Sequence, residues 1–557
     1  MVAELNSAPF ESPLLSRHMC KSMLSLRQQA TVLFLLTALL VLWETPVRAQ
    51  GTFGELADGP YDRLVIRGAN VIKGHGGPPT GPYDIVIQAD TIAEIIPFDP
   101  VTAQRRGESD RPTGDRVIDA SGMYVMPGMI DLHHHLRQEP LPLKYIYYLK
   151  LAHGATTVGP ASDRGVSEAM EQAELSEENE ILAPRMYPLW SWGDSTDFSQ
   201  GQIEDPSMAP QVAQQMVDRG ARQVYLNNIT WNEELFGAAA EAVRKAGGVT
   251  GVHIPLSNTA VIDAVDAARL GVDMILHHYG YAESSLDRTV QDFPDEYHYD
   301  DENDRFRRAG EVWQEANQSP DSRNRLLTEV ADSLAAYGVT MQPTRVVYEA
   351  NRDILRARSL PWHEKYTHQA LMDLYQPSKK RHGAYFYDWS SEDEQAWYDA
   401  FDLWGDLIEA FSAQGGTVAY GTDDAYIWAT PGFSNVRELQ LMRESGMRPL
   451  EVIRAATKNS AETLREPHLG LVHPGYKADL LIIDGNPVEN FRYMYFFGAL
   501  TVSEGEGKTS RTEGILHTIK DGIVIQNDQL MDEVERMVEE SKEGIDRPNP
   551  VNAPFEP

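Results

Sequence analysis

The chain has 557 residues, more than one small domain needs and enough for a large enzyme domain with a smaller appendage. Hydrophobic residues make up 42% and charged residues 24%, which is typical of a soluble globular protein and argues against disorder, collagen or a polytopic membrane protein. Acidic residues outnumber basic ones by 83 to 49, and because a net charge of −34 is repelled by phosphate backbones, we expect no nucleic-acid partner.

The first 49 residues have the organisation of a secretory signal peptide. A basic region precedes the apolar run at residues 31–43, and residues 47–49 supply a V-x-A cleavage pattern. This run is shorter than the about 20 residues of a membrane span. We therefore expect cleavage near Gln50, export as a periplasmic or secreted protein, and no stable membrane insertion afterwards; an uncleaved anchor is the alternative. Cys20, the only cysteine, would be removed with the peptide, leaving neither disulfides nor thiolate ligands.

The rest of the chain changes character twice. Residues 62–126 predict short strands between Gly-rich turns, and strands return at residues 479–484 and 514–525. Between them, apolar strands alternate with helical stretches, which predicts a parallel α/β unit. The strand-rich parts are expected to pair as one β domain. We expect five segments: a signal peptide (1–49), a first β part (50–126), a central α/β unit (127–464), a second β part (465–528) and an acidic tail forming a surface extension (529–557).

Two connections in the central unit are unusually long. About 60 residues separate the strand at 274–277 from one near 339–342, and about 75 more lead to the strand at 417–420. Connections of this length often carry elements that cover a substrate. Helices that only enlarge the surface are the alternative.

The strongest chemical signal follows a Pro-Gly turn at residues 127–128, where an apolar strand ends in His133, His134 and His135. Because side chains alternate along a strand, His133 and His135 share one face while His134 points to the other. Two imidazoles that face the same way at a strand end suit a divalent metal ion. A structural histidine cluster is the alternative.

Other polar residues also stand at the ends of predicted strands. They are His253, the pair His277 and His278, and Asp423. In a barrel of parallel strands all such ends meet at one mouth, where active sites are built. Each histidine by itself is more often structural, yet together with the His-x-His pair they favour a metal site.

Seven segments between about residues 62 and 525 form a specific pattern: VIDASGMYVMPGMIDLHHH, GVHI, GVDMILHH, YGTDD, RPLEVIRAATKNSAETL, PGYKADLLIIDGNP and GILHTIKDGIVI. By these segments the chain resembles the amidohydrolase superfamily, in particular its imidazolonepropionase-like and prolidase-like branch. The resemblance implies a metal-dependent hydrolase with a (β/α)8 TIM-like barrel and a composite β-sandwich domain formed by the N- and C-terminal segments. By motif position, it implies as metal ligands His133, His135, His253 and Asp423, with His277 as a possible further ligand. It also implies that Asp423 and His277 are catalytic. His277 is chosen over His278 because the G-V-D-x-I-x-H spacing ends at His277.

One departure from the family concerns the fourth strand. Many relatives carry a carboxylated lysine there, in a G-A-D-x-I-K pattern, that bridges two metal ions. This chain has GARQVY at residues 220–225, with Tyr225 in the lysine position and no lysine between Lys150 and Lys245. Two dications need negative charge between them. We therefore expect one divalent metal ion, Zn²⁺ being the first choice and Fe²⁺ or Mn²⁺ the alternatives.

A second departure narrows the reaction. Deaminating members usually show H-x-x-E at the fifth strand, whereas Leu256 takes the Glu position after His253 here. This favours hydrolysis of an amide C–N bond in a peptide-like or N-acyl amino acid substrate. A deaminase or cyclic-ureide hydrolase on the same barrel is one alternative. A catalytically inactive barrel that acts as a binding protein is the other, although retention of the five candidate site residues argues against it.

In the hydrolase hypothesis, the metal ion lowers the pKa of a bound water to about 7. Asp423 orients that water and moves its proton to the leaving nitrogen, and His277 stabilises the oxyanion. Three residues are candidates for contact with the small-molecule substrate: Arg345 as a carboxylate clamp, Trp190 as the wall of an apolar pocket, and Tyr225. The alternatives are that Arg345 is solvated and that Trp190 belongs to the core. Whether the protein forms a homo-oligomer is left open.

Overall fold

The computed structural model describes residues 53–106, 111–137, 141–162, 165–192, 203–227, 231–254, 259, 261–287, 302–376, 389–502 and 507–543. The predicted signal peptide lies outside these ranges. Residues 52–557 form one compact unit. Within the described ranges, no helix combines the length and apolar composition that a membrane crossing requires.

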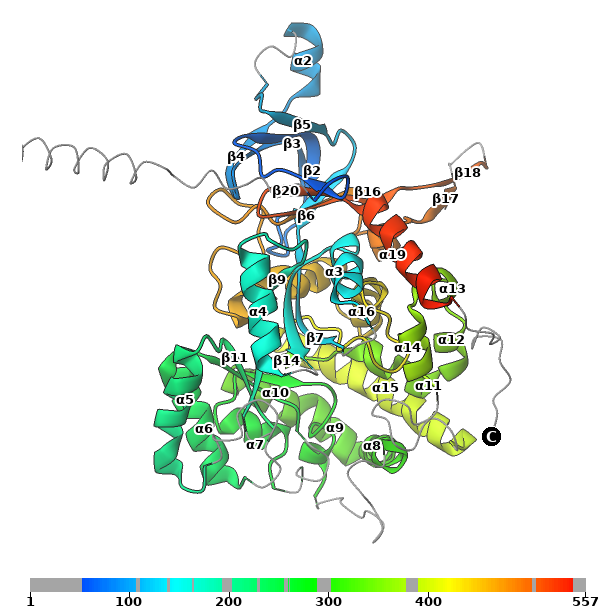
Figure 1. The fold of residues 1–557 in the computed structure, drawn as a ribbon. Coiled ribbons are helices and arrows are strands. Elements are labelled where there is room, and N and C mark those ends of the chain that lie inside the picture. The colour runs from blue at the N-terminus through cyan, green and yellow to red at the C-terminus, as the bar shows by residue number, and fades with distance from the viewer. Residues whose placement is uncertain are drawn as a thin grey trace, which may run out of the picture. The chain divides into compact units, whose positions relative to one another are not determined.

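Strands from both ends of the chain share one nine-stranded sheet (Figure 1). Its strands are β1 (Ala57–Asp58), β2 (Leu64–Val71), β3 (Thr80–Gln88), β4 (Thr91–Pro97), β5 (Arg116–Asp119), β6 (Tyr124–Pro127), β16 (Leu480–Asp484), β19 (Gly514–Lys520) and β20 (Ile523–Gln526). Their order is β1-β20-β19-β16-β6-β2-β3-β4, with β5 beside β2. Because β16 pairs antiparallel with β6, the last part of the chain joins the first in a composite β domain.

Apolar side chains from this sheet form a core of their own. Residues two apart on a strand point to the same face. Leu64 and Ile66 of β2 and Ile85 and Ile87 of β3 are fully buried and pack in one cluster with Ile482 of β16. Side chains from the two ends of the chain therefore complete the same hydrophobic core.

The strands between residues 129 and 418 pair in parallel. A three-stranded sheet contains β7 (Met129–Leu136), β8 (Ala155–Ser162) and β9 (Arg185–Met186). A six-stranded sheet contains, in order, β10 (Leu189–Trp192), β11 (Gln223–Leu226), β12 (Val249–Val252), β13 (Met274–Leu276), β14 (Thr340–Gln342) and β15 (Thr417–Val418). The fold is therefore α/β, and these strands lie in two hydrogen-bonded sheets.

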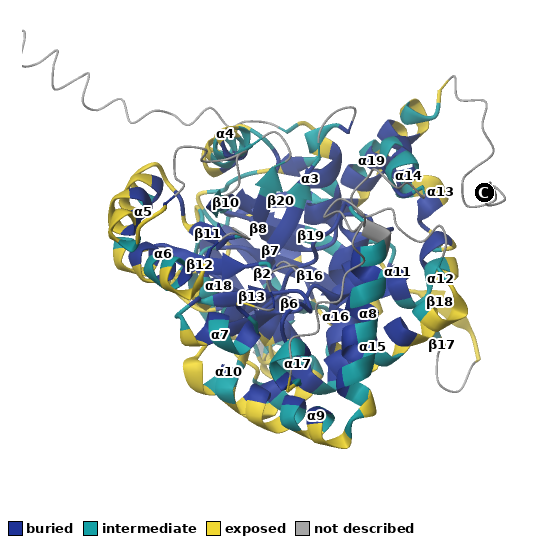
Figure 2. Ribbon diagram, turned by 90° about the horizontal axis from the view of Figure 1, so that it is seen from below, coloured by how far each residue is buried: buried dark blue, intermediate teal, exposed yellow. Residues whose placement is uncertain are grey.

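Backbone hydrogen bonds connect β7 to the segment that follows β15. The N–H of Leu132 donates to the carbonyl of Tyr420 over 3.1 Å, and the N–H of Asp423 donates to the carbonyl of His133 over 2.7 Å. The first parallel strand of the central unit is thus adjacent to the segment that follows the last one. Figure 2 shows the parallel strands in dark blue at the centre, with helices around them.

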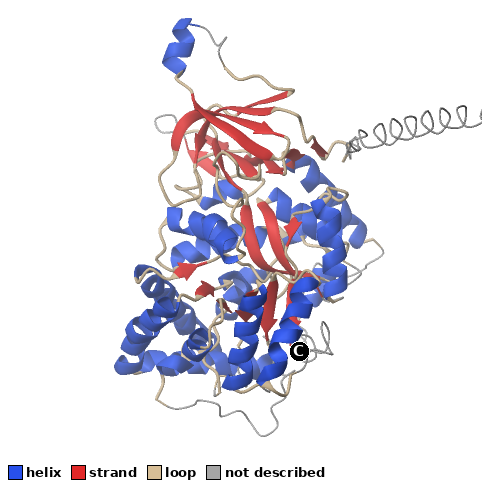
Figure 3. Ribbon diagram, turned by 90° about the vertical axis from the view of Figure 1, so that its left-hand side faces the viewer, coloured by secondary structure: helices blue, strands red, loops and turns tan. Residues whose placement is uncertain are grey.

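Helices cover the parallel strands (Figure 3). The described helices before the long connections are α2 (Pro100–Arg106), α3 (Leu143–Ala152), α4 (Val166–Glu177), α5 (Ala209–Asp218), α6 (Glu233–Ala246) and α7 (Ala264–Arg269). After β15 come α16 (Phe433–Glu444), α17 (Pro449–Arg454), α18 (Ser460–Thr463) and α19 (Asn527–Ser541). A hairpin of β17 (Leu500–Val502) and β18 (Thr509–Arg511) precedes β19.

The local sequence explains where such a helix begins and ends, as α6 shows. The side chain of Asn232 accepts a hydrogen bond from the N–H of Leu235 at the first turn, which satisfies an otherwise unpaired donor. Gly247 ends the helix in a left-handed conformation with φ 98°, which glycine adopts without steric cost. Phe236 and Val243 lie on its buried face.

The two long connections are mainly helical. The first, between β13 and β14, contains α8 (Glu302–Gln318), α9 (Pro320–Arg325) and α10 (Ala331–Tyr337). The second, between β14 and β15, contains the turn η5 (Arg345–Tyr348), α11 (Glu349–Arg352), α12 (Ile354–Arg358), α13 (His363–Tyr366), α14 (Gln369–Leu374) and α15 (Ser391–Ala413). Helix α15 packs against α8, so the two connections support each other.

The C-terminal helix α19 is an integral part of the compact unit, which corrects the expectation of a surface extension from residue 529. Leu530, Val534 and Val538 are fully buried, and the helix packs against α3. These apolar residues recur every four positions, so they share one face of the helix, which the acidic composition had concealed. Residues from 544 onward lie outside the described ranges.

Candidate metal centre

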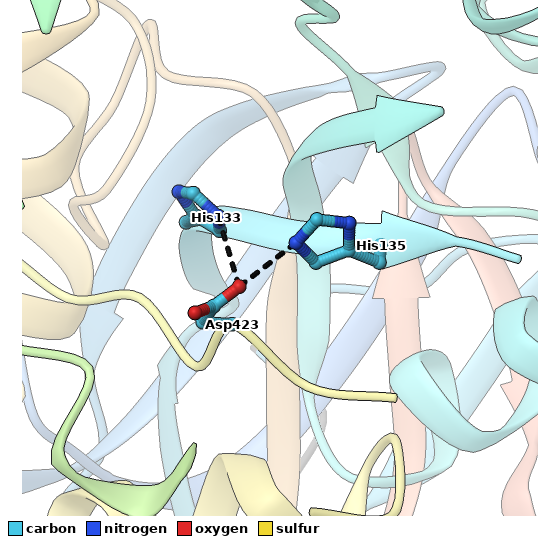
Figure 4. Close-up of side chains that lie close together, drawn as sticks. All are labelled: His133, His135 and Asp423. Atoms are coloured by element: carbon cyan, nitrogen blue, oxygen red, sulfur yellow. Dashed lines mark hydrogen bonds and ion pairs between the residues drawn. The ribbon is translucent and has the colours of Figure 1, made fainter. Parts of the chain in front are cut away.

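Strand β7 and the segment after β15 bring two imidazoles and a carboxylate together (Figure 4). The Nε2 atoms of His133 and His135 lie 3.0 Å and 2.8 Å from Oδ1 of Asp423. One potential ligand atom from each of the three residues lies within 4.8 Å of the others. Imidazole nitrogens and carboxylate oxygens are the usual protein ligands of catalytic zinc. The residues therefore fit a divalent cation.

Two residues of the site have a left-handed backbone. Asp423 has φ 52° and His277 has φ 64°, a region that residues other than glycine seldom adopt. Such a conformation costs about 1–3 kcal/mol and persists only where surrounding contacts hold it. Here the N–H of Asp423 donates to the carbonyl of His133, and the N–H of His277 donates to the carbonyl of Gln342 over 2.9 Å. These hydrogen bonds fix the direction of both side chains.

Burial and neighbouring charges determine the protonation of the cluster. Burial alone would raise the pKa of Asp423, but the nearby His133 and His277 hold that pKa well below its ordinary value. Burial lowers the pKa of His135, although its hydrogen bond to Asp423 opposes this effect. Burial, together with the adjacent His253, holds the pKa of His277 well below its ordinary range. An ionised Asp423 beside His135 and His277 with lowered pKa values suits metal binding, which requires a carboxylate and neutral imidazoles.

The cluster opens into a cavity of about 500 Å³, a size typical of small-molecule sites. Apart from the three candidate ligands, the wall contains Ala161, Ser162, Leu189, Ser191, Tyr225, Asn227, His253, His277, Arg305, Phe306, Val347, Tyr348, Tyr426 and Ile427. Arg305 and Phe306 belong to α8, and Tyr348 belongs to η5. Both long connections therefore contribute to the wall of the cavity.

His253 and His277 line this same cavity. Their ring centroids are 4.5 Å apart, and the ring of His253 stacks on Tyr279 at 4.7 Å. Nδ1 of His277 lies 2.6 Å from Oγ1 of Thr344 and 3.7 Å from Oδ2 of Asp423. Among the described residues, the cluster of mutually close ligand atoms does not include His253. Its role as a ligand stays a prediction.

The neighbouring histidines point elsewhere. His278 is buried, and its ring packs edge-to-face against Trp397 with centroids 5.2 Å apart, so His277 is the member of the pair that lines the cavity. His134 is also buried and does not line the cavity. Alternation along β7 accounts for this difference between His134 and its two neighbours.

Two predicted substrate contacts, Arg345 and Trp190, are corrected by their positions outside this cavity. Arg345 is 1% exposed, and its guanidinium donates to the carbonyl of Phe401 over 2.6 Å, so it serves the packing between helices. Trp190 is 2% exposed on β10. Because side chains alternate along the strand, Leu189 and Ser191 face the cavity while Trp190 faces away.

Tyr225, in the position of the bridging lysine, does line the cavity. Its hydroxyl oxygen lies 3.5 Å from Nδ1 of His133. Burial raises the pKa of Tyr225 well above its ordinary value, so the phenol is neutral. A neutral phenol does not supply the negative charge that holds two dications together, which favours a site for one ion.

Sequence reasoning missed three residues around the cluster: Lys150 near the ligands, Thr344 beside His277, and Arg305 in the cavity wall. Lys150 had a recognisable signal, because it interrupts a run of apolar residues in a short helix. The other two had none, since their positions depend on how distant elements pack.

Comparisons with known proteins find similarity to amidohydrolases. Residues 404–524 match the model of the amidohydrolase family. The ochratoxinase of Aspergillus niger is 36% identical over 104 residues, a match covering 18% of this chain and 21% of the relative. An adenine deaminase of Geobacillus kaustophilus is 32% identical over 97 residues, covering 16% and 17%. The structure of a Xaa-Pro dipeptidase aligns with a TM-score of 0.51 at 18% identity, covering 83% of this chain and all of that one, which shows a shared fold. The family match over residues 404–524 supports the resemblance of the chain to the amidohydrolase superfamily, and the shared fold agrees with it.

Proposed function

We propose that the protein is a metal-dependent hydrolase that cleaves an amide C–N bond of a small substrate. The observation that carries this proposal is the convergence of His133, His135 and Asp423 in one cavity. The match to the amidohydrolase family supports it. The matched segment spans about a fifth of the ochratoxinase, so the argument for amide hydrolysis depends mainly on the geometry of the candidate metal centre.

We also infer that strands β7, β8 and β10–β15 close into a (β/α)8 barrel. The hydrogen bonds between β7 and the segment after β15 support closure, since they join the first strand to the chain directly after the last strand. The candidate site residues lie near or just after the C-terminal ends of several of these strands. Barrel enzymes of this kind build their active sites at that end.

The proposed cation is held by His133, His135 and Asp423, with His253 as a further candidate ligand, and zinc is the first choice. Such an ion acts as a Lewis acid and makes a nucleophilic water available near neutral pH. Asp423 accepts the proton of the attacking water and delivers it to the leaving nitrogen. In the tautomer with the proton of His277 on Nε2, Nδ1 accepts from the hydroxyl of Thr344, and Nε2–H donates a hydrogen bond to the substrate oxygen.

The function is tested by an activity screen of the metal-loaded protein against dipeptides, N-acyl amino acids and cyclic ureides. We expect release of an amine or amino acid from an amide and loss of activity with a chelator. Deamination is the second candidate, favoured by the similarity to an adenine deaminase. Release of ammonia from a base in the same screen would support that alternative. Leu256, whose identity argues against deamination, lies outside the described residues.

Arg305 replaces Arg345 as the candidate for binding a substrate carboxylate. It lies in the cavity wall and is 2% exposed, next to the aromatic side chain of Phe306. We expect Arg305→Met to raise KM for an N-acyl amino acid by about 10–100-fold, the loss of one hydrogen bond to a charged group. The KM for the same amide without its carboxylate should not change. Arg307→Met is the matched control, because Arg307 lies on the same helix and pairs with Asp393 instead of lining the cavity. An unchanged KM in Arg305→Met would contradict this assignment.

A further inference from the structure

Lys150 is a fully buried cation close to the candidate metal ligands. Its Nζ lies 2.7 Å from Oδ2 of Asp131 and 2.5 Å from Oδ2 of Asp424. The same atom lies 3.1 Å from both Oγ1 of Thr422 and Oδ1 of Asn435. An ammonium group removed from water needs compensation of this kind. Its partners come from β7, from the segment after β15 and from α16, so one side chain joins three elements.

Asp131 connects this cation to the backbone of the ligands. One of its oxygens accepts hydrogen bonds from the N–H of His133 at 3.3 Å and from the N–H of Thr422 at 3.0 Å. The other accepts from the hydroxyl of Thr422 at 2.7 Å and from Lys150. A single carboxylate therefore holds both the strand that carries His133 and the residue that precedes Asp423.

Asp424 makes the second connection, directly after Asp423. It is fully buried, and its Oδ2 accepts hydrogen bonds from Lys150 and from the hydroxyl of Ser434 at 2.6 Å. Because Asp423 has a left-handed backbone, contacts that fix residues 422 and 424 also fix the direction of the side chain between them. Carboxylates from both sides of the site thus meet at one ammonium group.

We propose that Lys150 is a positioning residue for the metal centre. By binding Asp131 and Asp424 together, it holds Asp423 at the distance from His133 and His135 that a shared cation requires. This inference rests on the metal site of the proposed function, and it does not require Lys150 to touch metal or substrate. Without the ammonium group, two buried carboxylates would repel each other, and the two ligand-bearing segments would separate.

A role in folding alone predicts a different result, and Lys520 provides the matched comparison. Lys520 on β19 is 2% exposed, and its Nζ donates to the carbonyl of Ser176 over 2.6 Å and to Oδ1 of Asn179 over 2.8 Å. It also lies 3.2 Å from Oδ2 of Asp521 and does not line the cavity. Replacing either lysine by Met removes a buried cation, so both changes should lower thermal stability. Only the change at Lys150 should affect metal binding.

We expect Lys150→Met to weaken zinc binding by about 10–100-fold, the range for residues that orient metal ligands. Lys520→Met should bind zinc with wild-type affinity. Zinc affinity is measured on the folded full chain by competition with a chromophoric chelator, and folding is checked by circular dichroism. Asp424→Asn retains the shape of the side chain and loses its charge. It should also weaken zinc binding, and it provides the test if Lys150→Met does not fold.

Equal zinc affinities in the wild type, Lys150→Met and Asp424→Asn would overturn the inference. The same loss of affinity in Lys520→Met and Lys150→Met would overturn it too, because the effect would then follow stability alone. The assay contains no substrate, so a wild-type protein that binds zinc but hydrolyses no amide would count against the proposed function and not against the role of Lys150.

Discussion

Replacing Asp423 by Asn is expected to lower kcat for amide hydrolysis by about 10²–10⁴-fold, the contribution of a general acid–base group. Asparagine retains the shape of the side chain but does not accept the proton of the attacking water. Although burial raises the pKa of Asp423, His133 and His277 hold that pKa well below its ordinary value, so the carboxylate is ionised and can act as a base. The measurement is kcat of the metal-loaded variant with the best substrate from the screen.

Metal content in the same preparations separates catalysis from metal binding. Because Asp423 contacts both imidazoles, we expect Asp423→Asn to lose part of the metal and nearly all of the turnover. Turnover should therefore stay low even when excess zinc restores occupancy. A variant with full occupancy and wild-type kcat would show that another group takes the proton.

Removing either imidazole of the His-x-His pair should abolish metal binding and activity together. In His133→Ala or His135→Ala, one carboxylate and one imidazole remain in the described cluster, too few ligands for a protein zinc site. We expect zinc affinity to fall by more than the about 10–100-fold seen when an outer partner of a ligand is lost. Metal content after dialysis and kcat are the measurements.

His134→Ala is the matched control for this pair. His134 lies between the two candidate ligands on β7, is buried, and does not line the cavity. Its loss leaves a void in the packing, so thermal stability should fall while zinc content remains near that of the wild type. Equal loss of zinc in all three variants would mean that the pair acts through folding and is not a ligand set.

The parts of the site that sequence predicted are those governed by local geometry. Alternation along a strand is sufficient to place His133 and His135 on one face, and both do line the cavity. The same rule, applied to β10, would have placed Trp190 opposite its neighbours. The prediction that Trp190 forms the wall of the substrate pocket failed because pairing with β11, which the sequence does not specify, fixes the register of β10 relative to the cavity.

The parts that sequence did not predict depend on contacts between distant segments. Lys150 meets Asp131 and Asp424 only after β7 and the segment following β15 have come together. Arg345 follows a strand, which is the position expected of a substrate-binding residue, yet helices from the second long connection enclose it. For the fold, the alternating strand and helix pattern predicted a parallel α/β unit, whereas the bounds of the helices in the long connections required the structure.

The most direct test of the metal centre is an anomalous difference map from crystals of the zinc-loaded protein, recorded at the zinc absorption edge. We predict one peak at bonding distance, about 2.0–2.2 Å, from imidazole nitrogens of His133 and His135 and from the carboxylate of Asp423. A zinc ion bound elsewhere in the chain, with no peak among these three side chains, would contradict the account.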